Sequence, residues 1–126
     1  MEPSIQCAEL FDHLADEEVL VLDCRSEAEW NRQRMHIPGA LWMTIEELAD
    51  AVPSLPDDEL IVLCDGSSDG SDSRRACRLL RLCGRDAVFL QGGLPAWVRG
   101  GFPTEPHVSR RSHVFADGSE SVSVPR

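Results

Sequence analysis

The strongest constraint on the fold of this chain is a strand-length apolar segment followed by a loop rich in turn-forming residues. Leu60 to Leu63 form an uninterrupted apolar run, and Cys64 follows directly. Residues 65–73 are mostly Gly, Ser and Asp, and a helical pattern begins near Ser73. The backbone N–H groups of such a loop and the N-terminus of a helix favour anions, including a thiolate. The segment therefore predicts a thiol at a strand end, beside a loop similar to those that hold phosphate.

The rest of the chain alternates strand and helix signals. Further strands are expected at 19–22, 41–43 and 88–90, where β-branched and large apolar residues cluster. Helices are expected at 8–14, after capping boxes at Ser26–Glu29 and Thr44–Glu47, from Ser73 to the stop at Gly84, and at 96–98. Alternation of this kind predicts an α/β fold with a mainly parallel sheet.

Length and composition limit the number of domains and the classes of partner. The chain has 126 residues, so we expect one domain at 1–106 and a poorly ordered Ser-, Arg- and Pro-rich tail at 107–126. A net charge of −10 argues against nucleic acid and anionic membranes as partners. Five cysteines without an export signal favour reduced thiols and a cytoplasmic location. Zinc-ligand spacing is absent from the sequence, so no metal site is expected.

Three segments, in order, resemble the rhodanese domain family. The first joins Asp23-Cys24-Arg25 to His36-Ile37-Pro38-Gly39-Ala40. The second is Val62-Leu63-Cys64, which is similar to the strand end that carries the family's catalytic cysteine. The third is Gly92-Gly93-Leu94-Pro95-Ala96-Trp97. Together the segments span nearly all of residues 4–103.

The resemblance implies a five-stranded parallel sheet flanked by helices on both faces. It also implies sulfur transfer through a persulfide on the catalytic Cys64, without a cofactor. The expected partners are a small sulfur donor such as thiosulfate, a small-molecule or protein persulfide, and a thiol or cyanide acceptor. Asp23 and Arg25 would support the loop. The implied substrate-binding loop consists of Asp65, Gly66, Ser67, Ser68, Asp69, Gly70, Ser71, Asp72, Ser73 and Arg74.

This loop departs from the family pattern Cys-x-x-Gly-x-Arg-Ser. Counted back from the helix, the cysteine's place falls on Ser67; counted from the strand, it falls on Cys64 in a lengthened loop. We favour Cys64, because Asp65 and Gly66 are poor strand formers. The loop aspartates oppose a thiolate and an anionic donor, whereas Arg74 favours both. We therefore expect a working pocket tuned to a donor other than free thiosulfate.

Alternative interpretations remain open. The lengthened acidic loop also fits a non-catalytic rhodanese-like module that binds a protein or acts in regulation. Phosphatases and arsenate reductases share the fold, but here the aspartates oppose a phosphate dianion. The loop also matches much of a calcium-binding loop, but Ala76 stands where a bidentate carboxylate is needed. Cys24 is either a resolving thiol near the pocket or a core residue.

Overall fold

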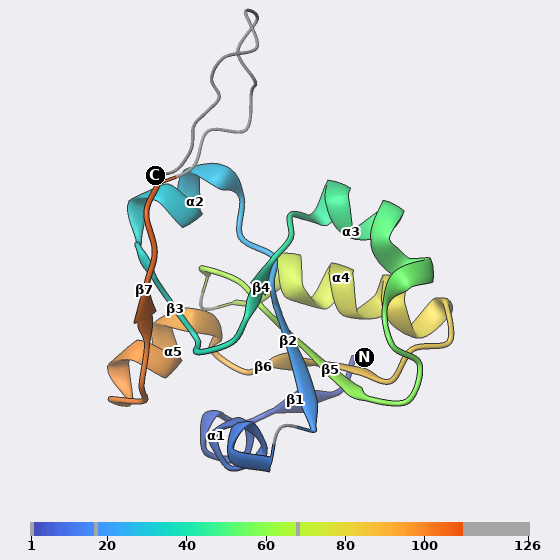
Figure 1. Ribbon diagram of the computed structural model, residues 1–126, viewed down its shortest axis with the longest axis horizontal. Helices are drawn as coiled ribbons and strands as arrows, with labels where there is room; N and C mark the ends of the chain where they lie inside the picture. The colour runs from blue at the N-terminus through green and yellow to red at the C-terminus, as the bar shows by residue number, and fades with distance from the viewer. Residues whose placement is uncertain (1, 17, 68, 110–126) are drawn as a thin grey trace, which may run out of the picture.

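The computed structural model describes residues 2–16, 18–67 and 69–109. Its main sheet is parallel and five-stranded, in the order β1-β6-β5-β2-β4. The strands are β1 (Ser4–Ile5), β2 (Val19–Asp23), β4 (Leu41–Trp42), β5 (Leu60–Cys64) and β6 (Ala87–Leu90). Asp23 of β2 stands beside Cys64 of β5, so both residues end adjacent central strands at the same edge of the sheet. The predicted α/β fold is confirmed (Figure 1).

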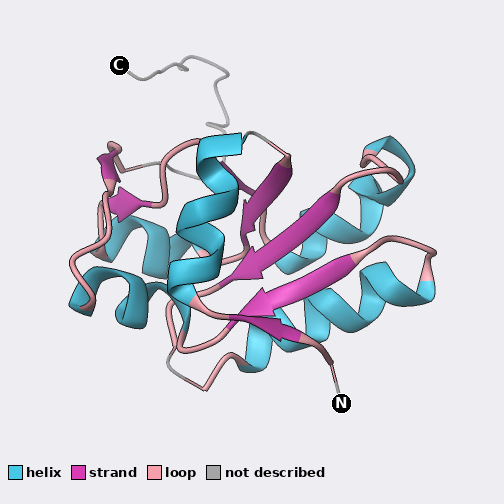
Figure 2. Ribbon diagram, turned by 90° about the horizontal axis from the view of Figure 1, so that it is seen from below, coloured by secondary structure: helices cyan, strands magenta, loops and turns pink. Residues whose placement is uncertain are grey.

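Helices cover both faces of this sheet (Figure 2). The helices are α1 (Cys7–Asp16), α2 (Glu27–Arg32), α3 (Ile45–Ala51), α4 (Ser71–Leu82) and α5 (Gly93–Arg99), with a 3-10 turn, η1, at Val52–Ser54. Side chains of α3 and α4, including Leu48 and Leu80, pack with Leu22 and Leu63 on one face. The α1 and α5 side chains pack with Val21, Val62 and Cys64 on the other face. Each central strand is therefore buried on both sides, which explains its unbroken apolar sequence.

Two helices begin at the capping boxes read from the sequence. Ser26 and Glu29 form a complete capping box at α2, and Thr44 and Glu47 form another at α3. Helix α4 begins differently, after Gly70, whose φ of 69° is a left-handed conformation that glycine adopts without strain. Its start at Ser71 lies slightly before the expected start near Ser73.

A small antiparallel pair of strands was absent from the expectations. Strand β3 (Met35–His36) pairs with β7 (Glu105–Pro106), which brings the end of the described chain beside α2. The N–H of His107 donates to the carbonyl of Arg34 at 2.9 Å. Residues 107–109 thus belong to the described structure, whereas the remainder of the predicted tail, 110–126, lies outside the described residues.

None of the helices in the described ranges has the length and apolar character needed to cross a membrane. The longest described helix, α4, has 12 residues and carries several arginines. A transmembrane helix needs about 20 mostly apolar residues.

Candidate functional site

The loop after β5 is organised around the side chain of Asp65. Its Oδ2 accepts the N–H of Ser73 at 2.8 Å, and its Oδ1 accepts the N–H of Ser67 at 3.1 Å and the hydroxyl of Ser67 at 3.2 Å. The Asp65 side chain is buried, and desolvation raises its pKa although these hydrogen bonds act in the opposite direction. The anion expected beside the N-terminus of α4 is therefore supplied by the chain itself.

The other polar groups of the loop also bond internally. Asp69 accepts the hydroxyl of Ser67 at 2.8 Å and the N–H of Ser71 at 3.0 Å, and the Ser67 bond is the main reason why the pKa of Asp69 is lowered. The N–H of Gly70 donates to Ser67 Oγ at 3.2 Å. The N–H groups of Ser67, Gly70, Ser71 and Ser73 therefore have acceptors within the loop. Ser68 lies outside the described residues.

Gly93 lets α5 press against this loop. The N–H of Leu94 donates to the carbonyl of Asp65 at 2.9 Å. A Cβ on Gly93 would lie 2.6 Å from the carbonyl oxygen of Ser67 and 2.9 Å from that of Asp65, and its φ is 62°. Any larger residue would push the loop away from α5. The Gly92-Gly93 signal thus has a physical role in shaping the loop.

Cys64 lies in the apolar core beneath α1 and α5. Its side chain has no exposed surface and packs in the same cluster as Leu10, Leu94 and Trp97. Burial, followed by the nearby charge of Asp23, raises the pKa of the Cys64 thiol well above its ordinary value. The sequence placed Cys64 correctly at the strand end, but the structure turns its thiol into the core and not into the loop.

Of the other cysteines, Cys7 packs against the cluster that contains Cys64, whereas Cys24 and Cys77 lie on the opposite face of the sheet. Cys24 packs in the cluster beneath α3 and α4, on the opposite face of the sheet, and its thiol donates to the carbonyl of Cys64 at 3.1 Å. A resolving role of Cys24 toward Cys64 is therefore not supported by this geometry. Cys77 is buried and its pKa is raised to about 11, mainly by desolvation. Cys83 is exposed and Cys7 is half-buried.

Asp23 and Arg25 form a buried ion pair beneath the loop. Arg25 Nη2 lies 2.8 Å from Asp23 Oδ2, and Arg25 Nε donates to the same carboxylate. The guanidinium also donates to the carbonyls of Gln33 at 2.9 Å and Met35 at 3.0 Å. The pair thus joins the end of β2 to the end of α2 and the start of β3. These bonds reach α2 and β3, so support of the loop after β5 by this pair stays a prediction.

Arg74 and Asp72 of the predicted loop lie away from the cavity beside the loop. Arg74 lies over the ring of Phe89, with its guanidinium carbon 5.0 Å from the ring centroid. Asp72 is 3.5 Å from Arg75 in an exposed pair along α4. Neither Arg74 nor Asp72 is among the residues that line the cavity beside the loop.

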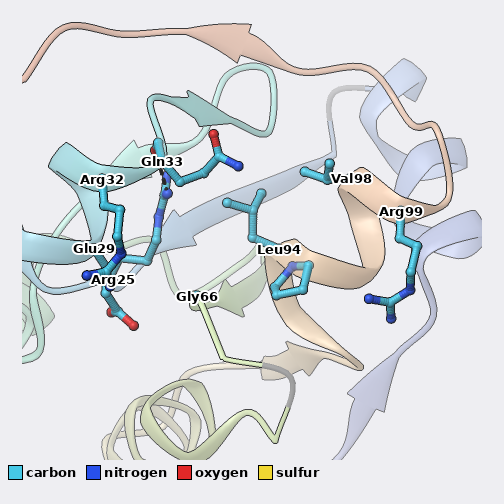
Figure 3. A pocket seen from close by; sticks show the side chains of 9 residues that line it. Arg25, Glu29, Arg32, Gln33, Gly66, Leu94, Val98 and Arg99 are labelled. Carbon is cyan, nitrogen blue, oxygen red and sulfur yellow. Dashed lines mark hydrogen bonds between the residues drawn. The ribbon is translucent and has the colours of Figure 1, made fainter.

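A cavity of about 280 Å³ opens beside Gly66, between α2 and α5 (Figure 3). Apolar side chains of α5 occupy the middle of the view, with Arg32 toward one side and Arg99 toward the other. The lining consists of Arg25, Glu29, Arg32, Gln33, Gly66, Leu94, Pro95, Val98 and Arg99. Of these, only Arg25 and Gly66 were among the predicted site residues. The sequence carried no signal that α2 and α5 would face each other.

A scan against family models matches the rhodanese-like domain over residues 6–99. The chain belongs to this family. A protein named sulfurtransferase from Allochromatium vinosum is 35% identical over 106 residues, covering 82% of this chain and 94% of that protein. An HTH-type transcriptional regulator of Mycobacterium tuberculosis is 33% identical over 105 residues, but the chain spans only 45% of its length.

Solved structures agree with this assignment. The rhodanese-like domain of an Anabaena protein is 31% identical, with a TM-score of 0.69, and covers 100% of this chain and 96% of its own. A thiosulfate sulfurtransferase from Pseudomonas aeruginosa is 34% identical with a TM-score of 0.70 over 84% of this chain, which corresponds to 20% of that protein. The chain is thus a rhodanese-like domain similar to sulfurtransferases.

Two histidines, His36 and His107, connect the segment around β7 to α2 and β3. His107 Nε2 lies 2.9 Å from the carbonyl oxygen of Trp30, so this nitrogen must donate. When His107 is neutral it has one N–H, so its Nδ1 can only accept, and His36 Nδ1, 2.9 Å away, is then the donor. His36 Nε2 lies 3.5 Å from the Glu105 carboxylate, and the His107 ring stacks on Trp30 with centroids 3.5 Å apart. A neutral His107 receives this hydrogen bond from His36, whereas desolvation disfavours a protonated His107.

We expect the free energy of unfolding to fall as the pH is lowered below about 6.5, the ordinary histidine pKa. Desolvation lowers the pKa of His107, with the neighbouring charges of His36 and Arg25 acting in the same direction and the Trp30 carbonyl and Asp23 opposing them. The unfolded chain therefore takes up the proton first, which favours unfolding as the pH falls. Urea denaturation at several pH values below 7 would measure how steeply the free energy of unfolding depends on pH. His107→Phe keeps a ring on Trp30 and should flatten the slope, whereas a His13→Gln control should not.

Proposed function

We propose that this chain is a rhodanese-like binding module that recognises a protein partner and does not transfer sulfur through Cys64. The observation that carries the proposal concerns the Asp65 carboxylate, which accepts the N–H groups of Ser67 and Ser73. The loop N–H groups were expected to stabilise the Cys64 thiolate instead. A pocket whose donors already hold an internal anion is a poor site for thiosulfate or for a persulfide anion. A relative named as a transcriptional regulator supports a regulatory use of such a domain.

The environment of Cys64 supports the same proposal. A nucleophilic thiolate needs an electropositive, partly exposed position, because burial in apolar surroundings favours the thiol. Cys64 has no exposed surface, and its pKa is raised by desolvation and by Asp23. A donor would have to displace α1 or α5 side chains to reach its sulfur.

The second candidate is sulfur transfer through Cys64, which the similarity to proteins named sulfurtransferase favours. In that reaction the thiolate would attack the outer sulfur of thiosulfate, forming a sulfur–sulfur bond and releasing sulfite. Cyanide or a thiol would then remove the sulfur from the persulfide and restore the thiolate. Rearrangement of the core around Cys64 would be required at each turnover.

Intact-mass measurement distinguishes the two candidates. We expect reduced protein to gain no sulfur at Cys64 after incubation with thiosulfate or with glutathione persulfide. The assay should use a Cys83→Ser background, because Cys83 is exposed and can react without any binding site. Peptide mapping then locates any sulfur that is gained.

The matched control is Cys64→Ser in the same background. Gain of one sulfur by the parent, its loss in this variant and its removal by cyanide would establish the transferase and refute the binding-module proposal. Unchanged mass under all conditions supports the proposal.

A further inference from the structure

We infer that the cavity between α2 and α5 binds an acidic peptide segment that inserts one large apolar side chain. This inference rests on the proposed binding function and names the chemistry of the partner. The cavity lining combines the apolar residues Leu94, Pro95 and Val98 with Arg32 and Arg99. Figure 3 shows Leu94 and Val98 between the two arginines. Val98 is 42% exposed, so this apolar surface is open to a partner.

The charges of the cavity favour an anion. Arg25 is paired with Asp23, and the carboxylate of Glu29, which accepts the backbone N–H of Ser26, offsets part of the remaining positive charge. Arg32 and Arg99 are exposed and make no ion pair within the described part of the chain. Their positive charge is notable in a chain of net charge −10. Two arginines in the lining of one opening attract carboxylates at short range, against the long-range repulsion that the net charge of the chain exerts on an acidic partner.

Small inorganic anions fit the cavity less well than a peptide. Compact dianions need several converging donors, but Asp65 and Asp69 already accept the N–H groups of Ser67, Ser73 and Ser71. A volume of about 280 Å³ is also slightly below the range of typical small-molecule sites, roughly 300–1,000 Å³. Such a space suits a single anchoring side chain, with contacts to the arginines made by its neighbours.

Fluorescence polarisation with defined peptides tests this inference. The probe is a fluorescein-labelled Asp-Glu-Phe-Glu-Asp peptide, and the comparison peptides replace its Phe by Ala or its acidic residues by Lys and Arg. We expect the Phe-containing acidic peptide to bind most tightly and to weaken as salt is added. The Arg32→Glu/Arg99→Glu double variant should lose at least about tenfold in affinity.

Arg75→Glu is the matched control, because Arg75 is an exposed arginine on α4 that does not line the cavity. Circular dichroism should first show that all variants are folded. Three outcomes would overturn the inference: no binding of the acidic peptide, equal binding of the basic peptide, or an equal loss in Arg75→Glu. Binding of free phenylacetate as tight as that of the peptide would also overturn it and indicate a small-molecule site.

The outcomes remain separable from those of the mass experiment. Sulfur gain at Cys64 together with selective binding of the acidic peptide would refute the non-catalytic function but leave the peptide site intact. Lack of sulfur gain with no peptide selectivity would refute only the peptide site.

Discussion

Arg25→Met is expected to lower the free energy of unfolding by about 3–5 kcal/mol, the usual cost of removing one partner of a buried ion pair. Arg25 is 1% exposed and Asp23 is fully buried. The substitution leaves the Asp23 carboxylate without its guanidinium and takes hydrogen bonds from the carbonyls of Gln33 and Met35. It also removes the cation over the ring of Trp30, 5.0 Å from its centroid. Urea or thermal denaturation would measure the change.

The double variant Asp23→Leu/Arg25→Met provides the control. When both charges are removed, no uncompensated charge remains in the core, so the double variant should be more stable than Arg25→Met alone. If the two variants were equally destabilised, the loss would come from packing and from the carbonyls of α2 and β3. That outcome would contradict a dominant role of the ion pair.

The sequence predicted the fold well because its signals were local. The apolar run before Cys64 became β5, and the two capping boxes begin α2 and α3 as expected. Short elements without such signals were missed. Strands β3 and β7 contain two residues each and are held by partners distant in sequence, such as His36 and His107. Only tertiary contact creates these elements.

The orientation of Cys64 was harder to predict than its place. A strand buried on one face alternates apolar and polar residues, and that alternation shows which side chains share a face. Here β5 is buried on both faces, so Leu60 to Cys64 carry no alternation. The geometry decides it: Cys64 shares the face of Val62, beneath α1 and α5.

One available signal did point to Asp65. An Asp two residues before a Ser commonly accepts a backbone N–H in an Asx turn, which is the Asp65–Ser67 arrangement seen here. The bond from Ser73 N–H, which closes the loop onto α4, spans a longer separation and could not be read from this local pattern. No local sequence pattern could predict that residues of α5 line the cavity, because this depends on contacts between distant elements.

Asp65→Ala is expected to lower the free energy of unfolding by about 2–4 kcal/mol, because it leaves two loop N–H groups without an acceptor, at about 1–3 kcal/mol each. The raised pKa of Asp65 shows that desolvation already opposes the charged form, which partly offsets this loss. Asp65→Asn should be intermediate, since its single carbonyl oxygen can serve Ser67 or Ser73 but not both. Chemical denaturation would rank the three proteins.

The same variant tests whether Asp65 fills an anion site. Without the carboxylate, the N–H groups of Ser67 in the loop and Ser73 in the first turn of α4 should bind an anion from solution. Sulfate or acetate should therefore raise the melting temperature of Asp65→Ala more than that of the parent. Asp57→Ala, at an exposed position before β5 and outside this loop, is the control for general salt effects. An equal response in all three proteins would mean that the loop adapts its own backbone when Asp65 is lost, and that no vacant anion site forms.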